Sequence, residues 1–221
     1  MLFRDRDDAG MKLAAALAEF RGKDCVVLAL PRGGVPVAAH VAAALHAPLD
    51  LLLVRKIGAP GHAELAMGAV IDGGKAIVIR DERIIRLVGA NQGQFDAICR
   101  RELAEIERRR HSYLGNRPAP DLKGKIVIVV DDGLATGNTM RAALSAVRQR
   151  DPAMLVMAVP VAPEGVADDF SGEADRVVCL ATPEPFGAVG YFYLDFGEVT
   201  DAEVVALLAQ SRKPAPAAGA A

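Results

Sequence analysis

The residues best suited to chemistry stand in one run, Val129-Val130-Asp131-Asp132-Gly133-Leu134-Ala135-Thr136-Gly137-Asn138-Thr139. Two adjacent carboxylates leave an apolar stretch, and a short loop then opens a helix. The backbone amides of such a loop, with the helix dipole behind them, form an anion cradle to which Thr136 and Thr139 can add hydroxyl hydrogen bonds. Because carboxylates repel phosphate, Asp131 and Asp132 suit the hydroxyls of a vicinal diol, or a metal ion that bridges them to an anion. The run therefore predicts a sugar-phosphate site, and it lacks the Gly-Lys-Ser/Thr element of a Walker loop.

Basic residues follow two earlier apolar runs. Arg32-Gly33-Gly34 comes just after residues 25–30, and Arg55-Lys56 comes just after residues 49–54. Ligands of open parallel sheets bind at the carboxyl ends of the strands, so both groups are expected beside the acid pair. The first group has a plain turn as its alternative. The second could be a pair at the sheet edge whose stems cover apolar surface.

Two further segments are candidates for the acceptor or for a lid. His62 stands in the Gly/Pro-rich segment 57–62, which is expected to be a loop; a surface histidine is the alternative. Residues 185–195 are rich in aromatic side chains, and Phe186 and Tyr191 could stack against a base or another flat acceptor. The alternative for this cluster is aromatic packing beneath the C-terminal helix.

The elements that must position these residues are apolar runs of strand length alternating with helical segments. Uninterrupted apolar runs are typical of strands buried on both faces, which predicts an α/β fold with a parallel sheet flanked by helices. Strands are expected at 25–30, 49–54, 126–130, 154–159 and 176–180. Helices are expected at 12–20, 37–45, 95–113, 138–148, 163–170 and 201–210. Residues 68–71 and 75–80 flank Asp72-Gly73-Gly74, which predicts a hairpin.

Composition limits the remaining function classes. The 221 residues carry 26 basic and 28 acidic side chains, a formal charge of −2, and 52% are hydrophobic, which suits one folded domain. This balance argues against a general nucleic-acid binder but allows a local basic pocket. The cluster Arg108–Arg110 is expected to be a solvated helix end, because acids precede it. Cys25, Cys99 and Cys179 lack metal-ligand spacing and are expected to be buried apolar residues.

The ends of the chain give two more expectations. The charged N-terminus does not fit an ordinary secretory signal, and no apolar run is long enough for a membrane span, so a cytoplasmic protein is expected. Residues 212–221 are expected to be a disordered tail, because 214–221 contain only Pro, Ala and Gly.

The run 129–139 resembles the ribose 5-phosphate loop of the type I phosphoribosyltransferases. Leu30-Pro31-Arg32-Gly33-Gly34 stands where that family places its pyrophosphate loop, and Arg55-Lys56 stands where it often carries cations and a mobile loop. The chain is similar, more closely, to a group of stand-alone predicted phosphoribosyltransferases. In that group Pro-Arg-Gly-Gly-Val, Arg-Lys-Ile-Gly and Val-Asp-Asp-Gly-x-Ala-Thr-Gly recur in this order.

The resemblance implies a single domain over residues 1–211, with hood or acceptor elements at about 1–20 and 180–200. It implies transfer of phosphoribose from Mg-phosphoribosyl pyrophosphate to a nitrogen acceptor such as a nucleobase, with release of pyrophosphate. Mg²⁺ is the expected cofactor and a homodimer the expected assembly; neither a membrane nor a nucleic acid is expected as a partner. One alternative is a non-catalytic regulatory protein of the same fold that binds phosphoribosyl pyrophosphate or a nucleotide. The other is a different sugar-phosphate or phosphotransfer enzyme on a doubly wound sheet.

The resemblance also implies a role for each part of the site. Asp131 and Asp132 hold the ribose hydroxyls and contact the metal, directly or through the donor. The pyrophosphate is bound by the Arg32-Gly33-Gly34 loop and by Arg55 and Lys56, and segment 57–62 closes as a lid. The 5-phosphate is held by Ala135, Thr136, Gly137, Asn138 and Thr139.

Overall fold

The computed structural model describes residues 2–72 and 76–211, and its main sheet has five parallel strands in the order β2-β1-β6-β7-β8. Nearly every residue of the central strands is buried, which explains their continuous apolar sequences. The predicted α/β fold with a parallel sheet is confirmed. The strands are β1 (Cys25–Ala29), β2 (Leu49–Leu51), β6 (Ile126–Val130), β7 (Met154–Val161) and β8 (Arg176–Ala181).

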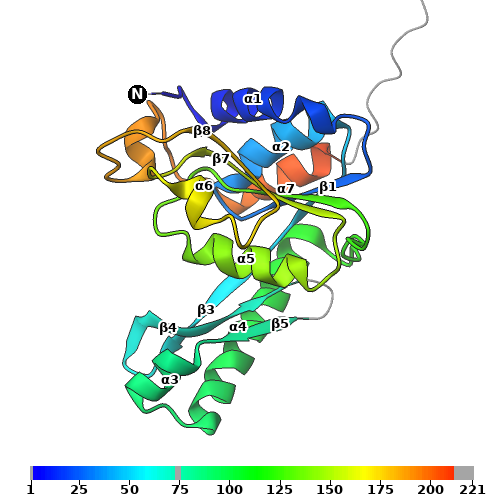
Figure 1. Cartoon of the computed structure of the whole chain (residues 1–221). Helices are drawn as coiled ribbons and strands as arrows, with labels where there is room; N and C mark the ends of the chain where they lie inside the picture. The colour runs from blue at the N-terminus through cyan, green and yellow to red at the C-terminus, as the bar shows by residue number, and fades with distance from the viewer. Residues whose placement is uncertain (1, 73–75, 212–221) are drawn as a thin grey trace, which may run out of the picture.

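Helices cover both faces of this sheet (Figure 1). On one face lie α1 (Arg6–Ala16), α2 (Gly34–Leu45) and α7 (Asp201–Gln210), and on the other lie α5 (Asn138–Arg148) and α6 (Val166–Asp169). The alternation of strand side chains divides the core accordingly. Val27 and Ile128 belong to the apolar cluster with α2, whereas Leu28 and Val129 belong to the cluster with α5. Helix α2 begins shortly after the carboxyl end of β1, and α5 begins shortly after the carboxyl end of β6.

A second sheet is antiparallel and lies beyond α5, in the order β3-β4-β5 (Figure 1). It contains β3 (Val54–Ala59), β4 (His62–Ile71) and β5 (Ile77–Arg80), and it packs with α3 (Glu82–Val88) and α4 (Gln92–Leu114). The predicted strand 49–54 is wrong as one element, because the chain leaves the parallel sheet after Leu51. The predicted loop 57–62 is also wrong, since residues 57–59 pair with β4 and the turn is at Pro60-Gly61.

Several boundaries differ from the sequence prediction. Residues 68–71 and 77–80 pair as the expected hairpin, whereas Gly73, Gly74 and Lys75, like the tail 212–221, lie outside the described residues. The first helix begins at Arg6 because the Asp5 side chain caps it, and η1 (Ala18–Phe20) follows it as a separate turn. The predicted helix 163–170 is only the single turn α6. Helix α3 was not predicted.

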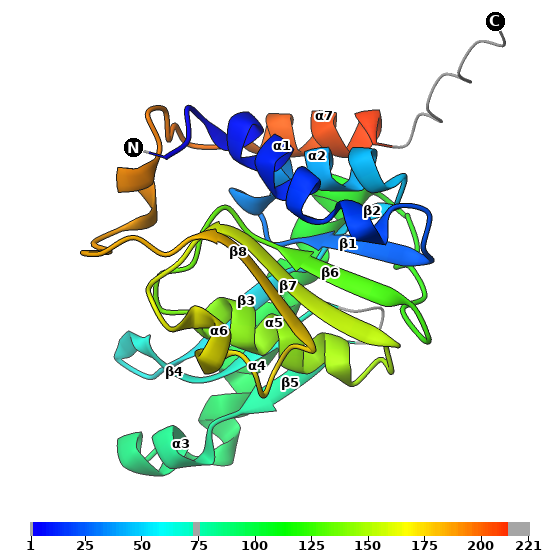
Figure 2. The ribbon, with the colours of Figure 1, turned by 45° about the horizontal axis from the view of Figure 1, so that its top comes forward.

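The N-terminal segment and the chain after β8 lie side by side at one end of the molecule (Figure 2). The amides of Leu2 and Phe3 both donate to the carbonyl of Phe192 over 3.0 Å, and the Leu194 amide donates to the carbonyl of Phe3 over 2.9 Å. A short 3₁₀ helix, η2 (Val189–Phe192), stands in this region. We call residues 2–5 and 186–197 together the hood.

The basic cluster at the end of α4 divides into two environments. Arg108 and Arg109 bind Glu105 on the helix surface, whereas Arg110 binds the buried carboxylate of Asp72. The interpretation of this cluster as a solvated helix end is therefore wrong for Arg110. The pair joins α4 to the end of β4.

Cys25 and Cys99 are buried as predicted, whereas Cys179 is half-buried. Within residues 2–72 and 76–211, no three His, Cys, Asp or Glu side chains gather as a metal site. No helix over the same ranges has the length and apolar character of a membrane span.

Candidate functional site

The loop 131–139 leaves β6 and enters α5 at the carboxyl edge of the parallel sheet. The amide of Leu134 donates to the carbonyl of Val161 over 2.9 Å, which fixes the middle of the loop to β7. Gly137 caps α5 in the left-handed region (φ +74°), and a Cβ there would lie 2.8 Å from the Phe170 ring. Thr136 and Thr139 are exposed, together with Ala135 and Asn138. The loop thus presents an open helix N-terminus of the kind that binds anions.

The two carboxylates at the start of this loop both accept hydrogen bonds from protein groups. Asp131 Oδ1 accepts the amide of Asp132 over 2.9 Å. Burial, followed by the neighbouring charge of Asp132, raises the pKa of Asp131 well above its ordinary value. Asp132 Oδ2 accepts from Arg6 Nε over 2.8 Å. The pair therefore combines one carboxylate that resists ionisation with one that has a cationic partner.

The loop after β1 packs directly against the acid pair. A Cβ at Gly33 would lie 2.0 Å from Asp132 Oδ2, and a Cβ at Gly34 would lie 2.8 Å from the carbonyl oxygen of Val130. Only glycine permits so close an approach of the two loops. The structure thus brings Gly33 and Gly34 to Asp131 and Asp132, as two loops at neighbouring strand ends should meet.

Arg32 projects away from the acid pair toward α7. Its guanidinium pairs with Glu198, and Nη1 lies 3.6 Å from Asp201 Oδ1. The hydrogen bond with Glu198 raises the pKa of Arg32, so this side chain is a permanent cation.

Arg55 and Lys56 lie on β3, outside the parallel sheet. They line a cavity of about 650 Å³ together with His62 and Thr139. Arg55 binds the buried carboxylate of Glu102 through Nη2 at 2.7 Å. Burial raises the pKa of Glu102, but hydrogen bonds from Arg55 and Arg101 outweigh it and hold this pKa below its ordinary value. The basic residues of β3 thus share a cavity with Thr139, the last residue of the loop 131–139.

The sequence model of the Phosphoribosyl transferase domain matches residues 6–192, which include the loop after β1, the hairpin and the loop 131–139. The chain belongs to this family. Two Mycobacterium tuberculosis proteins, MT0597 and Rv0571c, whose names assign them provisionally to the phosphoribosyl transferases, are each 45% identical over 219 residues. The match covers 99% of this chain and 49% of each relative, so the chain spans about half their length. The crystal structure of TT1426 from Thermus thermophilus is 46% identical with a TM-score of 0.81, over 95% of this chain and 99% of that one.

In this phosphoribosyl transferase domain, the hood covers the acid pair. Tyr193 is buried, its hydroxyl donates to the carbonyl of Asp132 over 2.5 Å, and burial strongly raises the pKa of this phenol. A Cβ at Gly133 would lie 2.4 Å from the Val189 side chain. Tyr191 is 70% exposed, and Phe186 is half-buried against Phe192 with ring centroids 5.2 Å apart. The aromatic cluster therefore has a packed part under the hood and an open part beside it.

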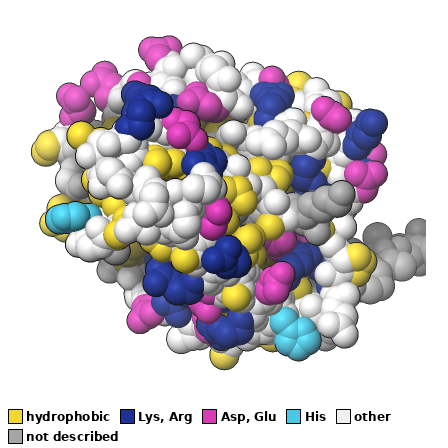
Figure 3. Space-filling view, turned by 90° about the horizontal axis from the view of Figure 1, so that it is seen from below, with side chains coloured by type: hydrophobic (Ala, Val, Ile, Leu, Met, Phe, Trp, Pro, Cys, Tyr) yellow, Lys and Arg dark blue, Asp and Glu magenta, His cyan; other side chains and the backbone are white. Residues whose placement is uncertain are grey.

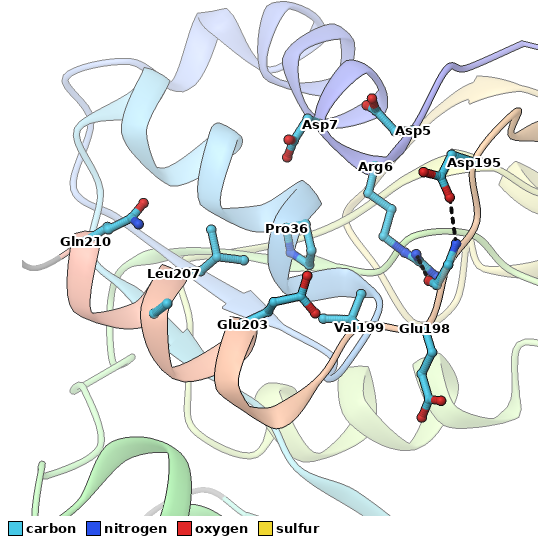
Figure 4. A pocket seen from close by; sticks show the side chains of 12 residues that line it. Asp5, Arg6, Asp7, Pro36, Asp195, Glu198, Val199, Glu203, Leu207 and Gln210 are labelled. Carbon is cyan, nitrogen blue, oxygen red and sulfur yellow. Dashed lines mark hydrogen bonds between the residues drawn. The ribbon is translucent and has the colours of Figure 1, made fainter.

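Arg6 is the most important site residue that was not predicted. It stands at the start of α1, binds Asp132, and donates from Nη1 to the Gly197 carbonyl over 2.7 Å. Its guanidinium lies 3.9 Å from the centroid of the Phe196 ring. Figure 4 shows Arg6 reaching from α1 toward the segment that carries Asp195. One residue thus links α1, the hood and the acid pair.

A second cavity, of about 490 Å³, lies between the start of α1, the segment 195–199 and α7 (Figure 4). Its described lining carries Arg6 and the carboxylates of Asp5, Asp7, Asp195, Glu198 and Glu203. Arg6, which lines this acidic cavity, also binds Asp132.

Proposed function

We propose that this domain transfers phosphoribose from phosphoribosyl pyrophosphate to a nitrogen acceptor and releases pyrophosphate. The observation that carries the proposal is the loop 131–139, in which an acid pair and an open helix N-terminus stand on one short segment at the sheet edge. In the reaction, the bond from C1 to pyrophosphate breaks, the bond from nitrogen to C1 forms, and the acceptor nitrogen loses a proton.

The catalytic work in this proposal is positioning and charge stabilisation. Asp131 and Asp132 would accept the ribose hydroxyls and lie near the positive charge that develops on the sugar. The amides of residues 135–139 and the hydroxyls of Thr136 and Thr139 would bind the 5-phosphate. The amides of Gly33 and Gly34 would receive the pyrophosphate.

The basic side chains of the proposed site are paired with carboxylates, which has consequences for ligand binding. Arg32 binds Glu198 and Arg55 binds Glu102. Each guanidinium has five N–H donors, so phosphate oxygens can bind those that the carboxylate leaves free, and donor binding is expected to weaken with salt. Lys56 is exposed on β3 and can meet a phosphate without breaking such a pair.

Mg²⁺ fits the oxygen donors of this site. Asp131 and Asp132 supply carboxylate oxygens, and no third acidic, histidine or cysteine ligand joins them among the described residues. Such a set suits an ion that keeps several waters and is held partly by substrate phosphates. When bound with the donor, Mg²⁺ neutralises charge on the departing pyrophosphate.

The acceptor side is assigned to the hood. The exposed ring of Tyr191 and the half-buried ring of Phe186 support a flat acceptor that stacks beside the acid pair. The proposed lid residue is His62, which is exposed at the start of β4 and lines the neighbouring cavity. The homodimer and the cytoplasmic location stay predictions.

The test is a pyrophosphate-release screen with Mg²⁺, phosphoribosyl pyrophosphate and a panel of purine, pyrimidine and other nitrogen acceptors. Release that depends on one acceptor and is lost in Asp132→Asn supports the proposal. Tight donor binding with no release for any acceptor would favour the non-catalytic regulatory alternative. Covalent phosphate on Asp131 or Asp132 would favour a phosphotransfer enzyme instead.

A further inference from the structure

The chain crosses twice between the parallel sheet and the second sheet. It leaves the parallel sheet after Leu51 and enters β3 at Val54, and after α4 it returns to reach β6 at Ile126. We call β3, β4, β5, α3 and α4, which are residues 54–72 and 76–114, the lobe. Two connecting segments do not by themselves fix an orientation, so contacts between side chains must hold the lobe in place.

Apolar packing holds the lobe against α5. Ala69 and Ile71 of β4 belong to the same apolar cluster as Leu144 of α5. Hydrophobic contact is non-directional, so this layer alone specifies the orientation of the lobe only weakly. The outer face of the lobe, seen in Figure 3 from the side of α3 and α4, carries acidic and basic side chains interleaved, as a solvated surface does. A fixed orientation therefore needs directional contacts on the inner side.

A buried ionic cluster supplies such contacts beside both crossings. Arg110 of α4 binds Asp72, just after β4, through Nη1, and its Nη2 lies 3.7 Å from Asp50 Oδ2. Asp50 stands on β2 and is 1% exposed. Nη2 also donates to the carbonyl of Arg117, on the returning segment, over 3.3 Å. One guanidinium thus contacts the parallel sheet, the end of the second sheet and the segment that joins α4 to β6.

Asp50 depends on this cluster to balance its charge. Its Oδ1 accepts the amide of Leu51 over 2.9 Å. Among the described residues, Asp50 Oδ2 and Arg117 Nη1 are the buried side-chain polar atoms without a hydrogen bond. Burial raises the pKa of Asp50, and the Leu51 amide and then the charges of Arg110 and Arg117 oppose this rise. Arg110 is therefore the ion-pair partner on which this buried carboxylate depends.

Another contact joins the lobe to α7. The hydroxyl of Tyr113, a buried residue of α4, donates to Asp201 Oδ1 over 2.7 Å. The Asp201 side chain is 65% exposed, so water competes for this acceptor. This contact constrains the lobe less strongly than the buried cluster does.

We propose that Arg110, paired with Asp50 and Asp72, is a positioning residue for the lobe. It holds the orientation in which β3 and Thr139 line one cavity. Its effect on donor binding rests on the proposed function, in which the donor is bound from both sides of this cavity. A buried ion pair suits the role because it can specify one arrangement of the chain even where it adds little stability.

Distances between spin labels, measured by electron paramagnetic resonance, report the orientation of the lobe directly. The labels are placed at Leu87→Cys on α3 and Ala15→Cys on α1, both exposed, in a Cys179→Ser background. Arg110→Gln should replace the single wild-type distance with a broad distribution. The control is Arg108→Gln, which removes an exposed ion pair within α4 and should keep the wild-type distance.

The same distances predict the loss of donor affinity. The apparent Kd equals the intrinsic Kd divided by the fraction of molecules in the binding-competent arrangement. If about one tenth of the Arg110→Gln molecules keep the wild-type distance, calorimetry should show phosphoribosyl pyrophosphate binding about tenfold more weakly. Ribose 5-phosphate contacts the loop 131–139 alone in the proposed function, so its affinity should stay that of the wild type.

A wild-type distance distribution in folded Arg110→Gln, or a broadened one with unchanged donor affinity, would overturn the inference. If Arg110→Gln does not fold, Asp72→Asn repeats the test, because it keeps the cation and the size of the side chain. Failure of the wild type to bind the donor would count against the proposed function, and the distances alone would then decide the role of Arg110.

Discussion

Replacing Arg6 with alanine should remove contacts between α1 and the hood and should also remove the cation that pairs with Asp132. The guanidinium makes three contacts: it donates to Asp132 and to the Gly197 carbonyl, and it stacks over Phe196. The truncation leaves the Asp132 carboxylate beside Asp131 without its cation. Because Arg6 lowers the pKa of Asp131 through its charge, that pKa should rise further in the variant.

The size of the effect follows from burial. The side chains of Arg6 and Asp132 are only 12% and 15% exposed, so the small values typical of surface ion pairs do not apply. Removing one partner of a buried ion pair lowers the free energy of unfolding by about 3 kcal/mol or more, and losing one charge-assisted hydrogen bond lowers it by about 2 kcal/mol. These contributions overlap because the contacts share one group. We expect Arg6→Ala to lower the free energy of unfolding by about 3 kcal/mol.

Urea denaturation of a double-mutant cycle separates the pair from the other contacts. Arg6→Ala, Asp132→Asn and the double variant should give a coupling free energy of about 2 kcal/mol. Arg4→Ala is the control, because Arg4 is exposed in the same segment, and it should change stability by no more than about 0.5 kcal/mol. A coupling near zero, or equal losses for Arg6→Ala and Arg4→Ala, would refute the role given to this residue.

Three further outcomes follow from the contacts of the acid pair. Asp131→Asn should raise the free energy of unfolding by about 1 kcal/mol at pH 7, because a carboxyl whose pKa is raised in the folded state destabilises that state when it ionises. In thermal melts near pH 3 the gain should vanish, and a loss of stability at pH 7 would contradict the reasoning. Tyr193→Phe should lower urea stability by about 1 kcal/mol by removing the hydrogen bond to the Asp132 carbonyl; an unchanged midpoint and slope would argue against that bond. Gly33→Ala should weaken donor binding, measured by calorimetry, by at least about tenfold, because the added Cβ meets Asp132 Oδ2. The control Gly172→Ala, which has open space around it, should leave donor binding unchanged, and equal binding in both variants would contradict the close packing.

The parallel sheet was predictable because its strands are buried on both faces and carry continuous apolar sequences. The same property hid the boundary after Leu51, since the apolar run 49–54 continues across the point where the chain changes sheets. Gly58 is one of the residues that made a loop the expected structure of segment 57–62. It stands at a register irregularity inside β3, where glycine serves a bulge rather than a turn.

In the candidate site, residues that are contiguous in sequence were predictable, whereas partners that are far apart in sequence were not. The acid pair and the phosphate cradle are contiguous, so their chemistry can be recognised from residue types and spacing alone. Arg6 meets Asp132 across 126 residues, and Arg55 meets Glu102 across 47. No local pattern marks such partners, because only the folded topology brings α1 to β6 and α4 to β3.

We propose that the acid pair of the loop 131–139 holds the sugar of phosphoribosyl pyrophosphate. The most direct measurement is calorimetric titration of that donor with Mg²⁺ into the wild type, into Asp131→Asn/Asp132→Asn, and into the control Asp168→Asn/Asp169→Asn. The control removes two adjacent exposed carboxylates from α6. Saturable binding by the wild type and the control, with binding abolished in the first pair, is the predicted result. Donor affinity unchanged by loss of Asp131 and Asp132 would contradict the claim.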